Sequence, residues 1–327
     1  MRRRDFIEAI AGSAAAWPFA ARAQQPAMPV VGFLTSRAAG DAPRLLTAVR
    51  QGLKDTGFEE GQNVAIEYRF AENRNEQLPK LAADLVQRQV TMIVATTTPA
   101  VLAAKAATTT IPIVFEMGND PVQLGVVASL SRPAGNITGV TQLNVEVASK
   151  RLELLHELLP AATVIALLID PADPTSAEAS KRNVEAAARR LGLEVHAVNA
   201  STERDFDTAF AKLIQLRAGG LVVSGGPFLV AREEQIAALA VRYAVPAVFE
   251  TREFIAAGGL MSYGGSLTDA YHLAGVYAGR ILKGEQPSEL PVQQATKVEM
   301  FLNLKAARAL GITVPLPLLG RADEVIE

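Results

Sequence analysis

The 327-residue chain contains no cysteine, and this absence excludes disulfide bonds, thiolate zinc sites and cysteine nucleophiles together. Histidine is scarce as well: His156, His196 and His272 lie far apart and form no H-x-x-x-H spacing, so no metal site is predicted. The sequence also lacks the P-loop, G-x-S-x-G and H-E-x-x-H patterns, a Ser-His-Asp set and a glycine-rich dinucleotide fingerprint. No catalytic residue and no cofactor are therefore predicted.

The charge is nearly balanced and the composition is that of a folded protein. The formal net charge is −2 and the pI is about 6.0, which gives no electrostatic footprint for nucleic acid. Hydrophobic residues make up 49% of the chain, which supports full-sized cores rather than disorder. The length favours about two domains.

The N-terminal segment has the features of an export signal. It opens with three arginines at 2–4, continues with a small, apolar run over 6–21 and ends in an A-x-A site, with cleavage expected before Gln24. The RRDFI pattern at 3–7 resembles a twin-arginine signal, and an ordinary secretory signal with a basic start is the alternative. Residues 1–23 are therefore set apart from the fold as a signal peptide.

The stretch 111–141 organises the rest of the chain. It predicts a buried strand, a Gly-Asn-Asp-Pro turn, a helix, a Pro-Ala-Gly-Asn turn and a second strand. Asp120 is expected to cap the helix, with Pro121 in its first position. A strand that leads into a capped helix is where open α/β sheets usually bind ligands, so this stretch is predicted to border the site.

Apolar β-branched runs alternate with helical patterns along the whole mature chain. Strands are predicted at 30–34, 64–70, 91–95, 111–115, 164–169, 195–199, 220–224, 247–250, 260–263, 292–295 and 299–302. Helices are predicted at 42–57, 76–89, 98–107, 148–159, 175–191, 203–217, 230–243, 253–257, 267–283 and 304–310. The alternation predicts an α/β fold, and because the scheme restarts after Thr141 we expect two doubly wound, parallel-sheet lobes.

The ligand-facing residues of such lobes lie at the carboxyl ends of the strands. The candidates are Phe33, Thr35, Ser36, Thr96, Thr97, Thr98, Glu116, Gly118, Asp120, Asp170, Ser224, Gly225, Gly226, Pro227, Glu250 and Tyr263. The threonines at 96–98 precede a helix whose free amides suit an anionic group, although Thr98 could equally cap that helix. Glu250 could bind a cation, and Tyr263 and Phe33 could flank the body of the ligand. Asp120 could be a helix cap rather than a ligand contact.

Several blocks of sequence resemble one known family. They include VGFL near the mature start, IVATTTPAVLAAKAATTTIPIVF, DPVQLGVVASLSRPAGNITGV, KRLELLHELLP, GGLMSYGGS and FLNLKAARALGITVP. These blocks are similar to the substrate-binding proteins of ABC transporters, in the group that includes tryptophan- and tyrosine-binding members. The resemblance extends from about Pro29 to Pro317.

The resemblance implies a type I periplasmic-binding-protein fold, in which a multi-strand hinge joins two lobes and a small-molecule ligand binds between them. Lobe 1 is then expected to comprise 29–140 plus 267–291, and lobe 2 to comprise 141–266 plus 292–327, with hinge segments near 139–144, 263–267 and 291–296. The family further implies a monomer in the periplasm that serves an ABC permease and ATPase. The expected ligand is an aromatic amino acid or a related carboxylate.

Three other functions remain open at this stage. A ligand-sensing module of a membrane signalling receptor uses the same fold without transport. A periplasmic enzyme would require a catalytic constellation, which the sequence lacks. A cytoplasmic repressor would require a DNA-binding module where this chain has a signal peptide.

Overall fold

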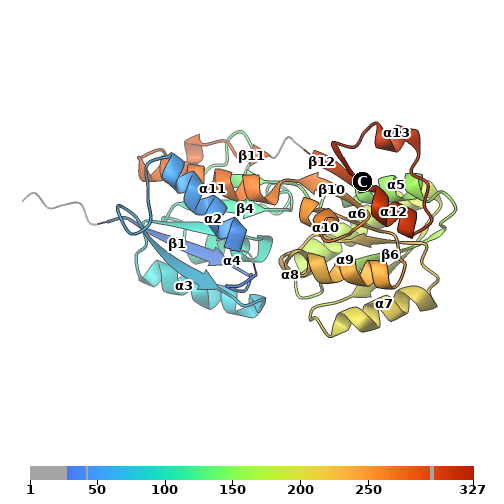
Figure 1. Cartoon of the computed structure of the whole chain (residues 1–327). Coiled ribbons are helices and arrows are strands. Elements are labelled where there is room, and N and C mark those ends of the chain that lie inside the picture. Colours follow the sequence, from blue (N-terminus) through green and yellow to red (C-terminus); the bar gives the residue numbers. More distant parts are fainter. Residues whose placement is uncertain (1–27, 42, 295–297) are drawn as a thin grey trace, which may run out of the picture.

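The computed structural model describes residues 28–41, 43–294 and 298–327, and it forms two α/β lobes that lie side by side (Figure 1). The predicted signal peptide and part of the third predicted hinge segment lie outside the described residues. The α/β prediction with two doubly wound lobes is confirmed. Among the described residues, no helix is long and apolar enough to cross a membrane.

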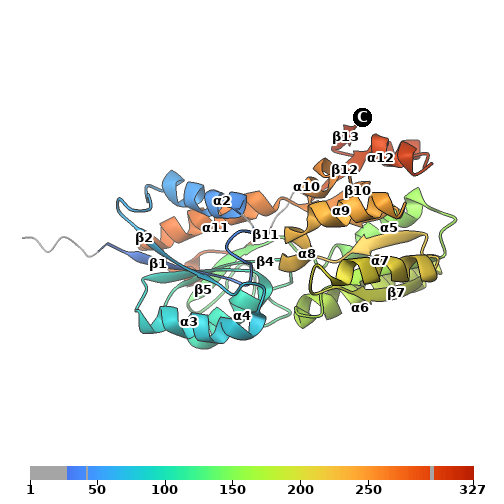
Figure 2. The same cartoon turned by 60° about the horizontal axis from the view of Figure 1, so that its bottom comes forward.

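The first lobe is built on a six-stranded sheet with the strand order β11-β5-β4-β3-β1-β2. Its strands are β1 (Val30–Thr35), β2 (Ala65–Phe70), β3 (Met92–Thr96), β4 (Ile113–Met117), β5 (Ile137–Thr141) and β11 (Gln293–Gln294), all paired in parallel. The helices are η1 (Asn75–Gln77), α2 (Pro43–Asp55), α3 (Leu78–Gln87), α4 (Thr98–Ala107), α11 (Leu267–Leu282) and η2 (Pro287–Glu289). Helices α2 and α11 cover one face of this sheet and α3 and α4 the other (Figure 2).

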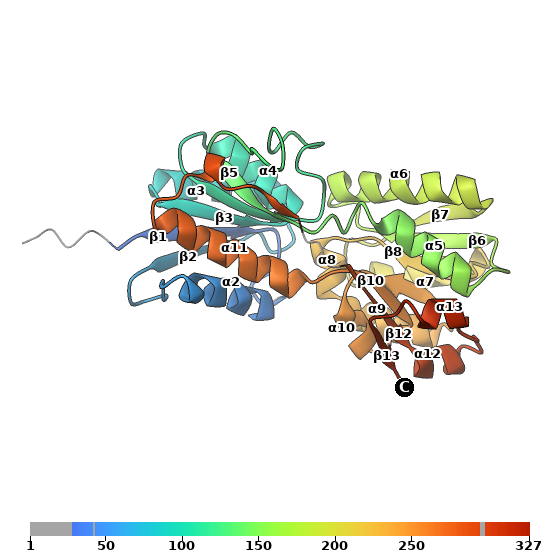
Figure 3. The same ribbon diagram turned by 90° about the horizontal axis from the view of Figure 1, so that it is seen from above.

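The second lobe contains a seven-stranded sheet with the strand order β13-β12-β10-β9-β8-β6-β7. Its strands are β6 (Val164–Ile169), β7 (Glu194–Asn199), β8 (Gly220–Val223), β9 (Ala247–Phe249), β10 (Met261–Gly265), β12 (Val298–Asn303) and β13 (Glu324–Ile326). Its helices are α5 (Ala148–Leu158), α6 (Pro174–Leu191), α7 (Asp205–Gln215), α8 (Pro227–Ala231), α9 (Glu233–Arg242), α10 (Arg252–Ala256), α12 (Leu304–Ala309) and α13 (Leu316–Leu319). Helices α5 and α6 lie on the opposite side of the sheet from α7 and α9 (Figure 3).

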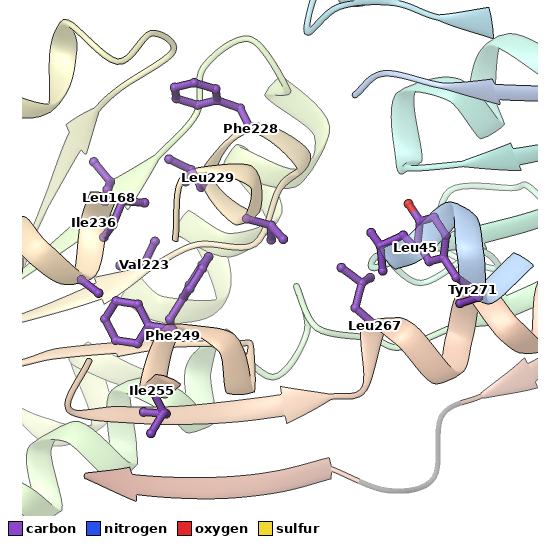
Figure 4. Close-up of a cluster of buried hydrophobic side chains, with 14 of the residues drawn as sticks. Leu45, Leu168, Val223, Phe228, Leu229, Ile236, Phe249, Ile255, Leu267 and Tyr271 are labelled. Carbon is purple, nitrogen blue, oxygen red and sulfur yellow. The ribbon is translucent and has the colours of Figure 1, made fainter. Parts of the chain in front are cut away.

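Strand β6 shows why the sequence folds into such layers. Its side chains alternate between two buried clusters: Ile165 and Leu167 pack with residues of α5 and α6, whereas Leu168 packs with residues of α7 and α9. A near-continuous apolar run is typical of a parallel strand that is covered on both faces. Burying each large aliphatic side chain contributes about 1.5–3 kcal/mol of transfer free energy. Figure 4 shows Leu168 among the buried side chains of this second face.

The chain passes between the lobes at three places. Residues 142–147, the first crossover, lead from β5 to α5, and Ser266, the second crossover, joins β10 to α11. The third passage falls between β11 of the first sheet and β12 of the second, and residues 295–297 are outside the described part of the chain. Strand β11 pairs with β5 of the first sheet, through Gln293 with Val140, so the first lobe extends beyond the expected boundary at residue 291. Sheet membership therefore supports dividing the chain after 141, at 266 and after 294.

Helix α11 returns to the first lobe and packs tightly on α2. A Cβ atom on Gly275 would overlap the carbonyl oxygen of Val49, and one on Gly52 would overlap the carbonyl oxygen of His272. The two helix backbones are therefore in direct contact. We expect Gly275→Ala to lower the free energy of unfolding by about 1–3 kcal/mol because the helices must separate. Urea denaturation checks this prediction. Gly40→Ala, at a glycine with open space around it, serves as the control; equal loss in both variants would contradict it.

The helix predicted after Asp120 is wrong. The segment between β4 and β5 consists of turns and bends. The Asp120 Oδ1 atom accepts hydrogen bonds from the amides of Val122 and Gln123, as a cap would, but Gly125 then adopts φ +64° and the Val126 amide bonds to the carbonyl of Pro121. The left-handed residue closes a compact turn instead of propagating a helix.

Other sequence expectations also differ in detail. The single helix predicted at 230–243 is two helices, α8 and α9, which are separated at Arg232 with φ −116°. Helix α6 begins at Pro174, one residue before its predicted start, and Asp173 caps it because its Oδ1 accepts from the Ser176 amide. Strand β12 runs antiparallel to β10, although only parallel pairs were expected. Neither α13 nor β13 was predicted from the sequence.

Candidate functional site

A polar cavity lies between the two lobes, where the carboxyl ends of parallel strands from both sheets meet. It contains about 400 Å³ of empty space when the solvent at its open mouth is included. Its lining residues are Arg37, Thr97, Thr98, Glu116, Gly118, Asn119, Gln142, Asn144, Val145, Asp173, Ser176, Gly225, Gly226, Pro227, Val230, Glu250 and Leu267. Both lobes and the first crossover therefore contribute to one site.

Half of the sequence-predicted residues line this cavity. They are Thr97, Thr98, Glu116, Gly118, Gly225, Gly226, Pro227 and Glu250. Phe33 and Thr35 instead line a small apolar pocket beneath α2, and Ser36 and Asp170 line a third pocket. Thr96, Asp120, Ser224 and Tyr263 line none of these three pockets.

Phe33 and Tyr263 do not flank the cavity, because each packs elsewhere. Phe33 is buried in the first lobe, where its ring centroid lies 5.8 Å from that of Tyr68. Tyr263 packs against the buried cluster beneath α5. The apolar part of the cavity wall comes from Val145, Val230 and Leu267 instead. Figure 4 shows Leu267 at the start of α11, directly after β10.

The cavity also contains residues that were not selected from the sequence. Arg37 and Asn119 follow β1 and β4, so both belong to the strand ends that the sequence indicates, although neither was chosen as a candidate. Gln142 and Asn144 lie in the first crossover, and Asp173 caps α6. Nothing in their local sequence distinguishes them from ordinary turn residues, because the pairing of the two lobes is what brings them together.

Arg37 crosses from the first lobe to the second. Its Nη1 donates to the carbonyl oxygen of Pro227 at 2.9 Å, and its Nε donates to the hydroxyl of Tyr271 on α11 at 3.4 Å. The side chain is buried, with 6% of the residue exposed. It therefore presents a buried positive charge in the cavity wall.

The threonines before α4 are already hydrogen-bonded. Thr97, at the N-cap position with φ 84°, makes no capping bond and accepts from the Ser36 hydroxyl at 2.9 Å. Thr98 is the first residue of α4 and not its cap, and its hydroxyl donates to Asn119 Oδ1 at 2.6 Å. The same oxygen accepts from the Ser176 hydroxyl of the second lobe at 2.9 Å, so Asn119 joins the two lobes.

A chain of buried side chains connects the cavity to both crossovers. Gln142 Nε2 donates to Glu116 Oε1 at 2.6 Å, and Gln142 Oε1 accepts from Asn144 Nδ2 at 2.9 Å. Asn144 Oδ1 in turn accepts from the Gly265 amide, next to the second crossover, at 2.9 Å. Because a carboxylate begins the chain and a backbone amide ends it, the orientation of each amide side chain is determined.

Arg151 of α5 joins this chain from behind the cavity. The fully buried guanidinium donates through Nη2 to the carbonyl of Asn144 at 2.8 Å and through Nη1 to the carbonyl of Tyr263 at 3.1 Å. Its Nη2 lies 3.8 Å from Glu250 Oε2, which is an ion-pair distance without a hydrogen bond. Arg151 therefore connects both crossover regions with a carboxylate of the cavity wall.

Burial shifts the pKa values of the cavity carboxyls upward. It raises the pKa of Glu116 to about 7 and also raises the pKa values of Glu250 and Asp173. Burial lowers the pKa of Arg151. Oε2 of Glu250 and Oδ2 of Asp173 are buried without a hydrogen-bond partner. A Cβ atom on Gly225 would overlap Glu250 Oε2, so a side chain there would require this carboxylate to move.

Ion pairs also join the lobes outside the cavity. Arg232 Nη1 lies 2.8 Å from Asp41 Oδ1, and Arg44 binds both Glu233 and Glu253 at 3.1 Å. Such partly exposed pairs contribute little stability each. Together they show that the two lobes are in contact around the cavity. Among the residues that the structure describes, no group of His, Asp and Glu side chains could hold a metal ion.

Comparisons with known proteins agree with this architecture. The family model "ABC transporter substrate binding protein" matches residues 41–326. A tyrosine-binding protein from Clostridioides difficile is 28% identical over 272 residues, which cover 80% of this chain and 74% of that protein.

Two solved structures share the fold. One is a conserved domain protein from Vibrio cholerae, with a TM-score of 0.81 and 25% identity over 91% of this chain and 99% of that one. The other is an ABC domain from Streptococcus pneumonia in complex with L-Trp, with a TM-score of 0.80 and 23% identity over the same shares. The family model describes binding proteins rather than enzymes, as the sequence predicted. The chain belongs to the family of ABC transporter substrate-binding proteins.

Proposed function

We propose that this protein is the exported receptor of an ABC importer and that it captures a small molecule in the cavity between its lobes. The observation that carries the proposal is the convergence of polar groups from both lobes and from the first crossover on one cavity. A molecule bound there contacts both lobes at once. The permease and ATPase of the importer are the expected partners, the protein is expected to act as a monomer, and a twin-arginine signal would deliver it to the periplasm.

The proposed ligand class is an aromatic amino acid or a related carboxylate, which the names of the tyrosine-binding relative and of the L-Trp complex support. In this chain the anionic group would lie near Arg37 and the N-terminus of α4, where the helix dipole favours negative charge. The cationic group would lie near Glu250. Because Phe33 and Tyr263 lie outside the cavity, Val145, Val230 and Leu267 would contact the apolar part of the ligand.

Binding would favour closure of the lobes. A ligand shifts a two-state equilibrium towards the form in which it makes more contacts, and here that form is the one with both lobes against it. Asn144 lies in the first crossover and accepts a hydrogen bond from the amide of Gly265, beside the second crossover. This hydrogen bond is therefore expected to be sensitive to the relative position of the two lobes.

A thermal-shift screen of the mature protein tests the proposal. The panel contains amino acids, aromatic acids, nucleosides and sugars. A solute present at 100 times its dissociation constant should stabilise the folded protein by about 2.7 kcal/mol, which gives a clear rise in Tm. Failure of every solute to raise Tm, or consumption of a solute by the protein, would contradict the receptor function.

A further inference from the structure

We propose that the cavity selects a ligand of net positive charge, of the size of a basic amino acid or a diamine, whose ammonium or guanidinium group binds Glu250 and Asp173. This inference rests on the proposed receptor function and assigns that receptor a different ligand class. It departs from the aromatic amino acid that the relatives suggest, because it follows from the side chains of this cavity alone.

The cavity wall has more acidic than basic side chains. Glu116, Asp173 and Glu250 line it, whereas Arg37 is the basic residue among the lining residues. When all three carboxyls are ionised, Arg37 and Arg151, which lies behind the wall 3.8 Å from Glu250, leave one negative charge in excess. A zwitterion adds no net charge, so it would leave that excess, whereas a ligand of charge +1 balances it. Burying an unbalanced charge is costly.

Two carboxylate oxygens are available to such a ligand. Glu250 Oε2 and Asp173 Oδ2 have no hydrogen-bond partner, and the two residues are only 6% and 2% exposed. Asp173 Oδ1, in contrast, accepts from the Ser176 amide as the cap of α6, so one oxygen of this carboxylate is used and one is free. A carboxylate oxygen accepts hydrogen bonds and cannot donate them when ionised, so the complementary ligand group is a donor with positive charge.

The side chains that could bind an anion are mostly engaged within the protein. The hydroxyl of Thr98 donates to Asn119, whereas Thr97 accepts from Ser36 and keeps one hydroxyl proton that could be donated to a ligand carboxylate. Arg37 is left for one anionic group. One carboxylate and two cationic groups, as in lysine or arginine, would match the charges of Arg37 and the surrounding acids.

The pKa values of the cavity carboxyls also agree with a cationic ligand. Burial raises the pKa values of Glu116, Glu250 and Asp173, so the cavity without a cation favours protonated carboxyls. A cationic ligand would stabilise the ionised forms instead. The lack of an aromatic side chain among the lining residues fits a ligand without a ring.

Matched pairs of probes test the selection by charge. L-arginine and L-citrulline differ in a guanidinium against a urea group, and L-lysine and L-norleucine differ in a terminal ammonium; putrescine is the diamine probe. We expect isothermal titration of the mature protein at pH 7.5 to show at least about tenfold tighter binding of a charged probe than of its neutral match. Asp173→Asn and Glu250→Gln should each reduce this ratio.

Asp173→Asn and Glu250→Gln each remove a negative charge and keep a side chain of nearly the same shape. Asparagine caps a helix as well as aspartate does, so α6 remains capped in Asp173→Asn. Glu178→Gln, at an exposed position of the same helix, is the control and should keep the wild-type ratio. An L-tyrosine or other neutral solute that binds more tightly than every cationic probe would overturn the inference and leave the proposed function standing. The inference would also be overturned if the ratio of charged-probe to neutral-probe affinity were unchanged in both Asp173→Asn and Glu250→Gln. If no solute of the thermal-shift panel and no probe binds, the proposed function fails as well.

Discussion

Replacing Arg151 with methionine is expected to lower the free energy of unfolding by about 3–5 kcal/mol. The guanidinium is fully buried, and its removal leaves the carbonyls of Asn144 and Tyr263 without their donor and Glu250 without its buried counter-charge. Methionine retains the unbranched shape, so the loss reports the charge and its hydrogen bonds rather than a cavity. Urea denaturation of the mature protein, followed by circular dichroism, measures the change.

Two further variants test whether the loss of stability in Arg151→Met comes from the missing buried charge. Glu250→Gln removes the orphaned carboxylate, so adding it to Arg151→Met should restore part of the lost stability. Arg189→Met, at an exposed position of α6, should remain close to the wild type. A loss of less than about 1 kcal/mol in Arg151→Met would mean that Arg151 does not hold the crossovers together.

The stability of the protein is expected to fall as the pH rises from about 4.5 to about 7, because of Glu116. Burial raises the pKa of this carboxyl from 4.5 to about 7 in the folded protein, where Arg37, Tyr271 and Glu250 face it. Between these pH values the folded state retains a proton that the unfolded state has released, so the free energy of unfolding decreases with pH. Over the whole window this contribution amounts to about 3 kcal/mol.

Glu116→Gln removes the titration and keeps an acceptor for Gln142. The difference in unfolding free energy between the variant and the wild type should therefore grow in favour of the variant by about 3 kcal/mol between pH 5 and pH 8. Urea denaturation at both pH values gives this difference, and Glu178→Gln should show none of it. A difference that does not change with pH would show that Glu116 titrates normally.

The sequence was sufficient for most of the fold. Runs such as 164–169 are apolar on both faces and could only be buried parallel strands, and the regular alternation with helices gave two lobes. The prediction of secondary structure failed where one local sequence pattern is compatible with two different structures. Asp120 makes the bonds of a cap, but the left-handed turn at Gly125 follows it and no helix forms there.

The site could be predicted only in part. The sequence locates the ends of the strands, but it does not show in which direction each side chain points there. Residues after β4, such as Glu116, do reach the cavity, but Phe33 and Tyr263 point into the cores of their lobes. Gln142 and Asn144 enter the site from a crossover. Their roles depend on a Glu116 contact and a Gly265 contact over sequence separations of 26 and 121 residues, which no local pattern encodes.

Both proposals require that one small molecule binds between the lobes, in contact with Asp173 and Glu250. Isothermal titration of the mature protein with the tightest solute from the thermal-shift screen tests it most directly. We expect one site per chain and a loss of affinity of about 100-fold or more in the Asp173→Asn, Glu250→Gln double variant, since each lost charged contact costs about 1.5–3 kcal/mol. Unchanged affinity in a double variant that remains folded would place the ligand elsewhere and contradict the account.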